Sequence, residues 1–518
     1  MFPLALLLAH AAAAHARFTG ADGLIGADGV LGADQLQYLA WIRDAAAHGG
    51  LASDLFTLSP SGHVYLEPLF AISAALYRLG AGLQVAYLVW KPVAALALAA
   101  AAIAWARRAF GERPAARAAA VALSLFLCTP VAALLSWTQL AGGRFRFNLY
   151  LLGDELLLAD KPWGYAPSAI GVALAAASLL CVARALEGER GGHSHRPAAR
   201  SPLALGALAA LLASWLHPWQ GITLVIVLCA LAAARRLRGA ASLALPAACA
   251  ALPLLYYLAL SHSDPAWRAA SHYEVIPRLP ALALLAGLGP LAALAALGVR
   301  RPRGQAFELI VLLWPLASLL TYFANDAFAP HAFQGLSLPL SVLMVRGWRR
   351  LRAGPLLGTI AICLATVPGL AFDARKFVRT ARGHAAQYYL PRSDAAALDW
   401  VAAHAPPGGV LAPTPFAAVV PSQTGRAVWV GHGYWSDDYP LRAREVDRLF
   451  GGRMTATQAR RFVQTTGASI LISDCSHPRD LRRALGPLIA RTRSFGCARV
   501  YLLRSSMLRS SSASTAGP

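Results

Sequence analysis

The chain has 518 residues, of which 57% are hydrophobic and only 14% are charged, and its mean hydropathy is +0.49. Soluble domains carry about 25% charged residues, so this composition excludes an ordinary soluble protein; it also excludes a disordered chain, which requires low hydrophobicity. The net charge of +22 would suggest nucleic-acid binding in a soluble protein. In a membrane protein the first question is which loops hold the excess.

Eleven apolar stretches have the length, or nearly the length, that a helix needs to cross a bilayer. They lie at residues 2–15, 82–106, 118–137, 165–185, 202–216, 217–234, 240–260, 279–298, 305–323, 334–347 and 355–372. The first is short and is followed by small residues, as in a signal-peptide core, although no Lys or Arg precedes it. Residues 64–80 contain Glu67 and Arg78, and we expect them to form a helix at the membrane surface rather than a span.

The basic residues follow the pattern of a multi-pass membrane protein. With the N-terminus in the cytoplasm, the inner connections hold 18 Lys and Arg residues against three acids, whereas the outer loops hold seven against 11. The inner connections are 106–117, 184–200, 235–239, 299–304 and 346–353, and the outer loops are 17–63, 138–164, 261–278 and 324–333. This distribution obeys the positive-inside rule. It predicts a cytoplasmic (inner) membrane protein that contacts membrane lipids, with no nucleic-acid partner.

The composition changes after Phe372. We expect a polytopic domain over residues 1–372, whose first outer loop lies at 17–80, to end there. We expect helices at 393–405, 441–452 and 455–467, and strands at 408–413, 426–431, 468–474 and 498–503. Residues 373–505 are therefore predicted to form a small α/β domain, outside the cytoplasm because the number of spans is odd. The Ser-rich tail 506–518 is predicted to be disordered.

Two of the seven cysteines, Cys475 and Cys497, fall in this predicted outer domain. An oxidising compartment favours a disulfide between them. Because sequence shows no geometry, a pair of free thiols remains equally open.

The first outer loop holds the most informative acid. A helical pattern runs from Gln35 to Ala47, and Asp34 stands where an N-cap is expected. Asp34 either caps this helix only or is also a carboxylate that the helix dipole keeps ionised as a general base, and both roles can hold at once. The aromatic and apolar residues that follow, Tyr38 among them, suit a helix resting in the membrane interface.

The segment ADQLQYLAWIRDAAAHG (33–49) resembles the first extracytoplasmic loop of GT-C-type glycosyltransferases, in particular the bacterial glycosyltransferase-39/ArnT-like and Rgt-like group. Residues 413–452 resemble the C-terminal domains of such proteins, and the order of one span, a long acidic loop, a bundle of spans and an outer domain is similar too. The resemblance implies a mainly α, GT-C-like fold of about eleven transmembrane helices with a small outer α/β domain. It also implies a polyprenyl-phosphate-sugar donor and Asp34 as the base. Tyr38 and Arg43, on the same helix, are candidate substrate-binding residues.

The second outer loop carries both signs of charge. Arg144, Arg146 and Lys161 are suited to bind a phosphate. The adjacent Asp154 and Glu155 are candidates for a divalent cation, for which the sequence gives no other evidence. The alternative, which we favour for a mere pair of neighbouring acids, is a solvated loop whose charges neutralise one another.

Three other residues are candidates because of their positions. His217, in the outer turn HPWQ, is either a functional group at membrane depth or the cap of a helix that Pro218 begins. Lys91 lies inside the second span, where it either meets a lipid phosphate or pairs with a carboxylate or the backbone. His331 lies in the last outer loop. The segment GHGYWSDDYP (431–440) either contacts a glycan or forms a structural turn.

Sugar transfer needs a carboxylate to deprotonate the acceptor and positive groups to stabilise the departing phosphate. We therefore expect an enzyme that moves a sugar from a polyprenyl-phosphate donor to an extracytoplasmic glycan, lipid or protein. One alternative is a transporter or flippase for a lipid-linked glycan, which would show internal repeats or broken helices. Another is a non-catalytic membrane scaffold.

Overall fold

The computed structural model describes residues 23–24, 32–131, 134, 143–188, 200–236, 240–273, 278–301, 305–352, 354–382 and 389–504. The chain divides into two compact units. The first, here called the helical unit, comprises Met1–Leu8, Trp90–Ala259 and Val275–Lys376; the second, the mixed unit, comprises Ala9–Val89, Leu260–Glu274 and Phe377–Pro518. The mixed unit thus joins the predicted first outer loop to the C-terminal segment.

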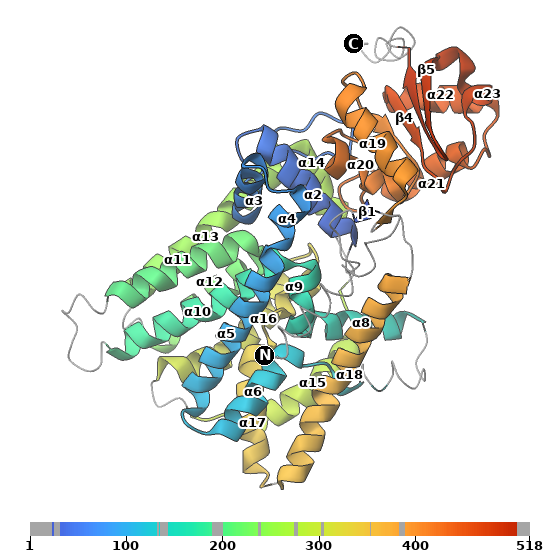
Figure 1. Ribbon diagram of the computed structural model, residues 1–518. Coiled ribbons are helices and arrows are strands. Elements are labelled where there is room, and N and C mark those ends of the chain that lie inside the picture. The colour runs from blue at the N-terminus through green and yellow to red at the C-terminus, as the bar shows by residue number, and fades with distance from the viewer. Residues whose placement is uncertain are drawn as a thin grey trace. The chain divides into compact units, whose positions relative to one another are not determined.

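The helical unit is built from helices and short helical turns (Figure 1). These are α5 (Trp90–Phe110), α6 (Pro114–Phe126), α8 (Gly143–Leu156), η1 (Leu158–Asp160), α9 (Lys161–Gly164), α10 (Ala166–Gly188), α11 (Arg200–Leu216), α12 (Pro218–Ala234), α13 (Ala240–Ser263), α15 (Ala281–Leu297), α16 (Ala306–Ala324), η4 (Ala329–Phe333), α17 (Ser337–Arg350) and α18 (Pro355–Arg382). Helices α13 and α18 continue into the mixed unit.

Among the described residues, four helices are long and apolar enough to cross a membrane: Leu83–Phe110, Ala166–Gly188, Ala240–Ser263 and Ala306–Ala324. Five shorter apolar helices accompany them: Pro114–Phe126, Pro202–Leu216, Pro218–Ala234, Ala281–Leu297 and Pro355–Ala371. These helices indicate a multi-pass membrane protein. The count of eleven spans stays a prediction, because the first predicted span, 2–15, lies outside the described residues.

One predicted span is wrong in its extent. Residues 118–137 do not form a single helix, because α6 ends at Phe126 and Leu127–Thr129 are not helical. The cause is Pro130, whose ring disfavours helical backbone in the residue before it. Residues 64–80 contain α3 (Pro68–Arg78), whose 11 residues are too few to span a bilayer.

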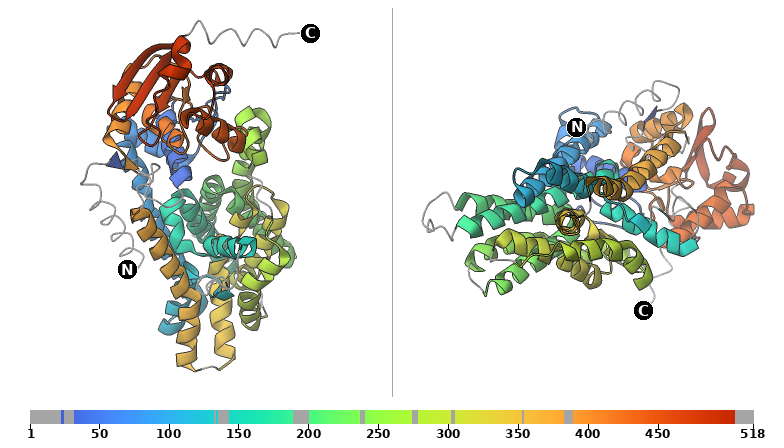
Figure 2. Two further views of the ribbon diagram at one scale, coloured as in Figure 1. Left: turned by 90° about the vertical axis from the view of Figure 1, so that its right-hand side faces the viewer. Right: turned by 90° about the horizontal axis from the view of Figure 1, so that it is seen from below.

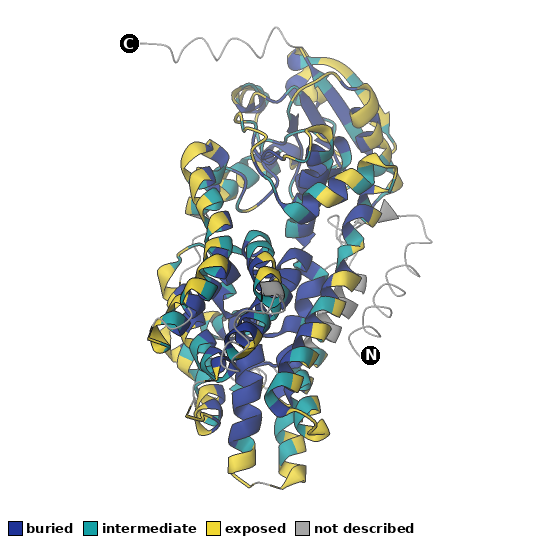
Figure 3. Ribbon diagram, turned by 90° about the vertical axis from the view of Figure 1, so that its left-hand side faces the viewer, coloured by how far each residue is buried: buried dark blue, intermediate teal, exposed yellow. Residues whose placement is uncertain are grey.

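Helix α17 lies at the centre of the helical unit. All residues from Ser337 to Gly347 are buried, and Figure 3 shows buried helix faces inside the unit and exposed ones outside. Leucines such as Leu255, Leu285 and Leu357 remain exposed on the outer helices, at 61%, 67% and 56%. Large exposed apolar faces are rare in water-soluble monomers, so these rows suit contact with lipid.

The mixed unit combines helices with a sheet. Its N-terminal part contains β1 (Gly23–Leu24), α2 (Gly32–Ala47), α3 and α4 (Leu83–Leu88), and α14 (Pro265–Tyr273) joins them. Strand β1 pairs antiparallel with β2 (Tyr389–Leu390) near the start of the C-terminal segment. The elements that follow are α19 (Arg392–His404), β3 (Val410–Leu411), η5 (Phe416–Ala418), α20 (Val420–Thr424), α21 (Tyr439–Phe450), α22 (Ala456–Thr466), β4 (Ile470–Ser473), α23 (Arg482–Leu485), η6 (Gly486–Leu488), β5 (Ile489–Phe495) and β6 (Ala498–Leu503).

The sheet has the strand order β3-β4-β6-β5, with β3 and β4 parallel and the other pairs antiparallel. Its last strands are the red arrows in Figure 2. All four residues of β4 are buried, as in a strand covered on both faces. Helix α19 contacts β5 and β6, and a core cluster that includes Leu449, Val463 and Tyr501 joins α21 and α22 to the sheet.

The structure contains the three helices predicted in this segment as α19, α21 and α22, and three of the predicted strands as β3, β4 and β6. The predicted strand 426–431 is wrong, because only Val428 makes an isolated bridge there. Strand β5 was missed because its exposed arginines hide the strand pattern of a sheet edge. Cys475 and Cys497 form a disulfide, and the predicted tail 506–518 lies outside the described residues.

Candidate functional site

Asp34 lies in the first turn of α2, not at its N-cap. The helix begins at Gly32, so the N-cap position predicted for Asp34 is wrong by about two residues: Gly32 and Ala33 take helical backbone and carry the helix start upstream. The carboxylate still lies in the first turn, where the backbone N–H groups and the helix dipole favour an anion. Its side chain is 20% exposed, so the group remains accessible from outside.

His432 faces Asp34 from the C-terminal segment of the same unit. Its Nε2 lies 3.5 Å from Asp34 Oδ1, and its side chain is only 2% exposed. The other ring nitrogen, Nδ1, accepts the N–H of Tyr434 at 3.2 Å, so the neutral ring carries its proton on Nε2, toward Asp34. At 3.5 Å the imidazole forms no hydrogen bond with the carboxylate among the described residues, but hydrogen bonds of catalytic groups are often long before substrate binds.

The segment 431–440 is held against the first outer loop. Ser436 Oγ accepts the backbone N–H groups of Gly431 and His432 and donates to the carbonyl of Phe56 at 2.8 Å. Thr57 Oγ1 donates to Asp437 Oδ2 at 3.1 Å. These bonds fix the turn that carries His432. The segment is therefore a structural turn that also carries His432 to Asp34, and its contact with a glycan stays a prediction.

Tyr38 and Arg43 project from the same helix as Asp34. Tyr38 belongs to an aromatic cluster, with ring centroids 5.1 Å from Phe70 and 6.0 Å from Tyr87. Arg43 Nη1 donates to the carbonyl of Ser422 at 3.2 Å and so ties α2 to α20. Their contacts within the described residues serve packing, and their predicted roles in substrate binding stay predictions.

In the helical unit, Lys161 lies between the two adjacent acids. Its Nζ is 3.1 Å from Asp154 Oδ2 and 3.8 Å from Glu155 Oε2, and its side chain is 1% exposed. Burial lowers the pKa of Lys161, but the neighbouring carboxylates of Asp154, Glu155 and Asp160 raise it above its ordinary value. The charges neutralise one another, as the favoured alternative stated, but in a buried cluster and not in a solvated loop.

His331 and Gln334 complete the shell around Glu155. His331 Nδ1 lies 3.0 Å from Oε1, and Gln334 Nε2 donates to Oε2 at 2.6 Å. Burial by itself raises the pKa of Glu155. The opposing effect of Lys161 and His331 is larger, and the pKa falls to about 2. Glu155 is thus an anion in this cluster, and it has little tendency to take up a proton.

His217 adjoins the same network. Its ring lies 5.8 Å from that of His331, and its Nδ1 accepts the N–H of Gln220 at 3.3 Å as the N-cap of α12, which Pro218 begins. Gln220 in turn donates to the carbonyl of Gln334 at 2.6 Å. The structure therefore brings together five residues that the sequence selected separately: Asp154, Glu155, Lys161, His217 and His331.

The other predicted basic residues lie outside this network. Lys91 Nζ donates to the carbonyl of Trp163 at 2.6 Å, which is the backbone pairing left open from the sequence. Arg144 is exposed at the start of α8. The side chain of Arg146 lies outside the described residues.

Sequence reasoning missed His432 and Gln334 as site residues. His432 gave one signal, its place in a polar and aromatic segment, but its partner Asp34 lies almost the whole chain away. Gln334 gave none, because a neutral amide next to an apolar run has no distinctive pattern.

The comparisons with known proteins concern the fold. The oligosaccharyltransferase AglB of Archaeoglobus fulgidus in its apo form is similar over 92% of this chain and 70% of its own, with a TM-score of 0.51 and 13% identity. AglB in complex with an inhibitory peptide and a dolichol-phosphate is similar over 98% and 74%, with a TM-score of 0.51 and 12% identity. ArnT from Cupriavidus metallidurans, bound to undecaprenyl phosphate, covers 97% and 99% at 13% identity, but its TM-score of 0.47 is too low to support the assignment.

The chain has the GT-C fold. The resemblance predicted from residues 33–49 and 413–452 is thereby confirmed at the level of fold. No family model and no curated protein sequence matches the chain. Since the GT-C likeness is at 12–13% identity, it describes the fold alone, and the chemistry has to be argued from the residues of each unit.

Proposed function

We propose that the protein is a membrane glycosyltransferase that moves a sugar from a polyprenyl-phosphate donor to an acceptor outside the cytoplasm. The observation that carries the proposal is the Asp34–His432 pair in a chain with the GT-C fold. The donor class is supported by AglB, which has the same fold and is seen with dolichol-phosphate. The charge distribution supports an inner-membrane location with the N-terminus in the cytoplasm and the C-terminal segment outside.

The transfer is a substitution at the anomeric carbon of the sugar. The acceptor oxygen forms a bond to that carbon, and the bond from the carbon to the phosphate oxygen breaks. Polyprenyl phosphate leaves with the bonding electrons, and the proton of the acceptor hydroxyl passes to the Asp34 carboxylate. We assign His432 a positioning role, because its Nε2 lies 3.5 Å from Oδ1 of the carboxylate.

The phosphate that leaves needs positive charge. The positive charge of Lys161 is already neutralised by Asp154 and Glu155, so we assign Lys161 a structural role in the helical unit. Arg144, exposed at the start of α8, and Arg146 are better candidates for the phosphate. A divalent cation is an alternative source of that positive charge.

Radiolabelled polyprenyl-phosphate sugars supplied to membranes that contain the protein test the proposal. We expect transfer by the wild type and a loss of about 10²–10⁴-fold in Asp34→Asn, the usual contribution of a general base. His432→Gln should lose less and should change the pH profile of the reaction. The matched control is Asp399→Asn, an exposed acid of α19, which should transfer normally. A folded Asp34→Asn protein with the normal rate would remove Asp34 from the mechanism.

A further inference from the structure

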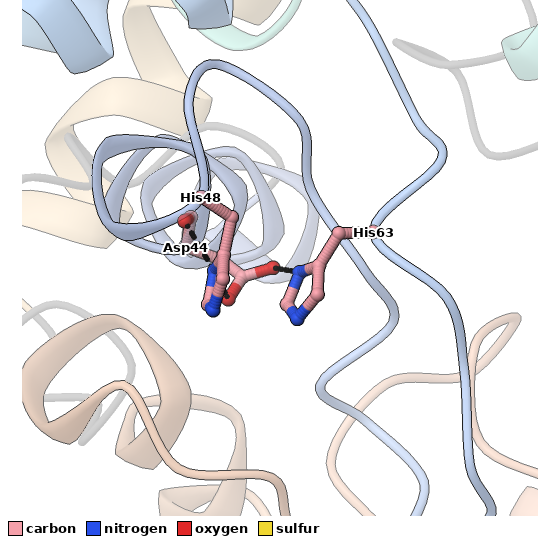
Figure 4. A group of neighbouring side chains, drawn as sticks. All are labelled: Asp44, His48 and His63. Atoms are coloured by element: carbon pink, nitrogen blue, oxygen red, sulfur yellow. Dashed lines mark hydrogen bonds and ion pairs between the residues drawn. The ribbon is translucent and has the colours of Figure 1, made fainter.

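A second carboxylate–histidine cluster lies in the mixed unit, away from Asp34 along α2. It consists of Asp44, His48 and His63, whose candidate ligand atoms all lie within 4.8 Å of one another (Figure 4). We propose that these residues form a zinc site that is distinct from the Asp34–His432 pair.

Asp44 orients both imidazoles. His48 Nδ1 donates to the backbone carbonyl of Asp44 at 2.9 Å and lies 3.0 Å from its Oδ1, and His63 Nδ1 donates to Oδ2 at 3.0 Å. With the proton on Nδ1, each neutral ring keeps its lone pair on Nε2. Figure 4 shows the second nitrogen of both rings on the same side, away from the carboxylate. This is the arrangement in which an outer carboxylate fixes the tautomer of a metal-binding histidine.

The carboxylate itself is fixed before any ion binds. Asp44 is only 5% exposed, and its Oδ2 accepts the backbone N–H of Ser53 at 2.7 Å and the Ser53 hydroxyl at 2.9 Å. The histidine side chains are 42% and 38% exposed. The orienting acid is therefore inside the protein and the ligands are at its surface, where an ion can enter.

The rings of His48 and His63 are stacked. Their centroids are 3.5 Å apart and their planes differ by 20°, so the two side chains lie side by side at the mouth of the cluster.

The donor atoms select the metal. Imidazole nitrogen suits zinc and its transition-metal neighbours, whereas magnesium and calcium prefer oxygen ligands. A pocket of about 490 Å³ opens over the cluster, and Ser59 and Ser61 line it as well. The remaining positions of a tetrahedral zinc can thus be filled by water or by a hydroxyl group. Arg426 also lines the pocket, but it donates to the carbonyls of Ala405 and Pro406 and is held by them.

The ion would connect two segments of the first outer loop. His48 follows the last turn of α2, and His63 lies 15 positions later, next to the bridge between Ala52 and Tyr65. Shared ligation would close this loop, so zinc should stabilise the folded state in proportion to its affinity.

Zinc binding is measured on the purified full-length protein in detergent, by competition with a chromogenic chelator and by metal analysis. We expect one zinc ion per chain, a rise in Tm on zinc addition, and no response to magnesium or calcium. The variants His48→Gln and His63→Gln should each lose at least 100-fold in zinc affinity. Asp44→Asn should lose about 10–100-fold, the usual effect of removing an outer carboxylate.

His404→Gln is the matched control, because His404 is an exposed histidine of the same unit that stacks on Trp400; it should bind zinc normally. The exposed positions of His48 and His63 make their variants suitable even if Asp44→Asn does not fold. The proposal is overturned if the wild type binds no stoichiometric zinc, or if a folded His48→Gln/His63→Gln double variant retains the wild-type affinity. Neither result depends on sugar transfer, so this test and that of the proposed function fail independently.

Discussion

The acidic residues of the two units differ in the basic side chains that they contact. In the helical unit, Asp154 and Glu155 contact the ammonium group of Lys161. In the mixed unit, Asp34 and Asp44 face imidazoles. A lysine stays charged throughout the physiological pH range, whereas an unperturbed imidazole is neutral above about pH 6.5.

This difference separates acids with a structural role from acids that are suited to catalysis or metal binding. The Lys161 cluster is neutralised in place and has little to gain from a proton or an ion. In the carboxylate–histidine clusters each acid faces an imidazole, an arrangement suited to proton transfer or to the orientation of metal ligands. The kind of basic residue beside an acid therefore indicates the role of that acid better than its own residue type does.

The largest expected effect comes from removing the permanent cation. Lys161→Met removes the ammonium group from the buried Glu155 and the half-buried Asp154, and breaking a buried pair costs about 3–5 kcal/mol. We expect a large fall in Tm in detergent, measured by tryptophan fluorescence. Adding Asp154→Asn and Glu155→Gln to the variant should restore part of the loss.

The control for this change is Arg144→Met in the preceding helix. Arg144 is exposed, so its substitution should alter stability by no more than about 0.5 kcal/mol. A Lys161→Met protein as stable as the wild type would show that the ammonium group does not neutralise these acids, and the contrast between the units would disappear.

Sequence reasoning succeeded where a local pattern determines the structure. Helix α22 carries a capping box at Thr455 and ends before Gly467, whose φ is +70°, and both signals can be read from the sequence. Strand β6 contains the β-branched Val500 and the aromatic Tyr501, both typical of strands. The apolar helices follow from composition alone, because lipid requires them.

It failed where the structure depends on distant segments. Nothing near Asp34 points to His432, since the fold alone brings these residues together. The spacing of Asp154 and Lys161 suggested neutralisation but not burial. Asp44 and His48 are four residues apart, on one face of a helix, which is a signal that was present and not used; His63 has no such relation to them.

Asp394 extends the comparison to an acid that is hydrogen-bonded by the backbone. Its Oδ1 accepts the N–H of Cys475 at 3.0 Å, and burial, with the charge of Asp474, raises its pKa to about 7. The unfolded chain has the ordinary, lower pKa, so this group contributes stability that is complete below about pH 4 and is lost as pH rises through 7.

We therefore expect the Tm to fall as the pH rises from about 4 to 7, and Asp394→Asn to flatten that slope. Burial likewise raises the pKa of Glu67 to about 8, so part of the slope should remain. Asp399→Asn, an exposed change in the same helix, should keep the full slope. An unchanged slope in Asp394→Asn would mean that Asp394 ionises normally in the folded protein.

The smallest effect concerns an acid of the mixed unit that does have a permanent cation. Asp437 Oδ2 accepts from Thr57 Oγ1 at 3.1 Å and lies 3.0 Å from Arg442 Nη2. Thr57→Val removes this hydrogen bond and the one that Thr57 Oγ1 accepts from the N–H of Ser59 but leaves the ion pair, so it should cost about 1–2 kcal/mol. Thr465→Val, whose hydroxyl bonds only within its own exposed helix turn, should cost less.

Asp437 resembles Asp154 and Glu155, because the positive charge of Arg442 already balances its negative charge. We therefore assign it a structural role. Thr57→Val should then lower the Tm slightly while the zinc affinity and the rate of sugar transfer stay at their wild-type values. A tenfold loss of transfer without a comparable loss of stability would contradict this expectation. It would place the contact between the first outer loop and segment 431–440 within the chemistry of Asp34, because that contact carries the turn on which His432 lies.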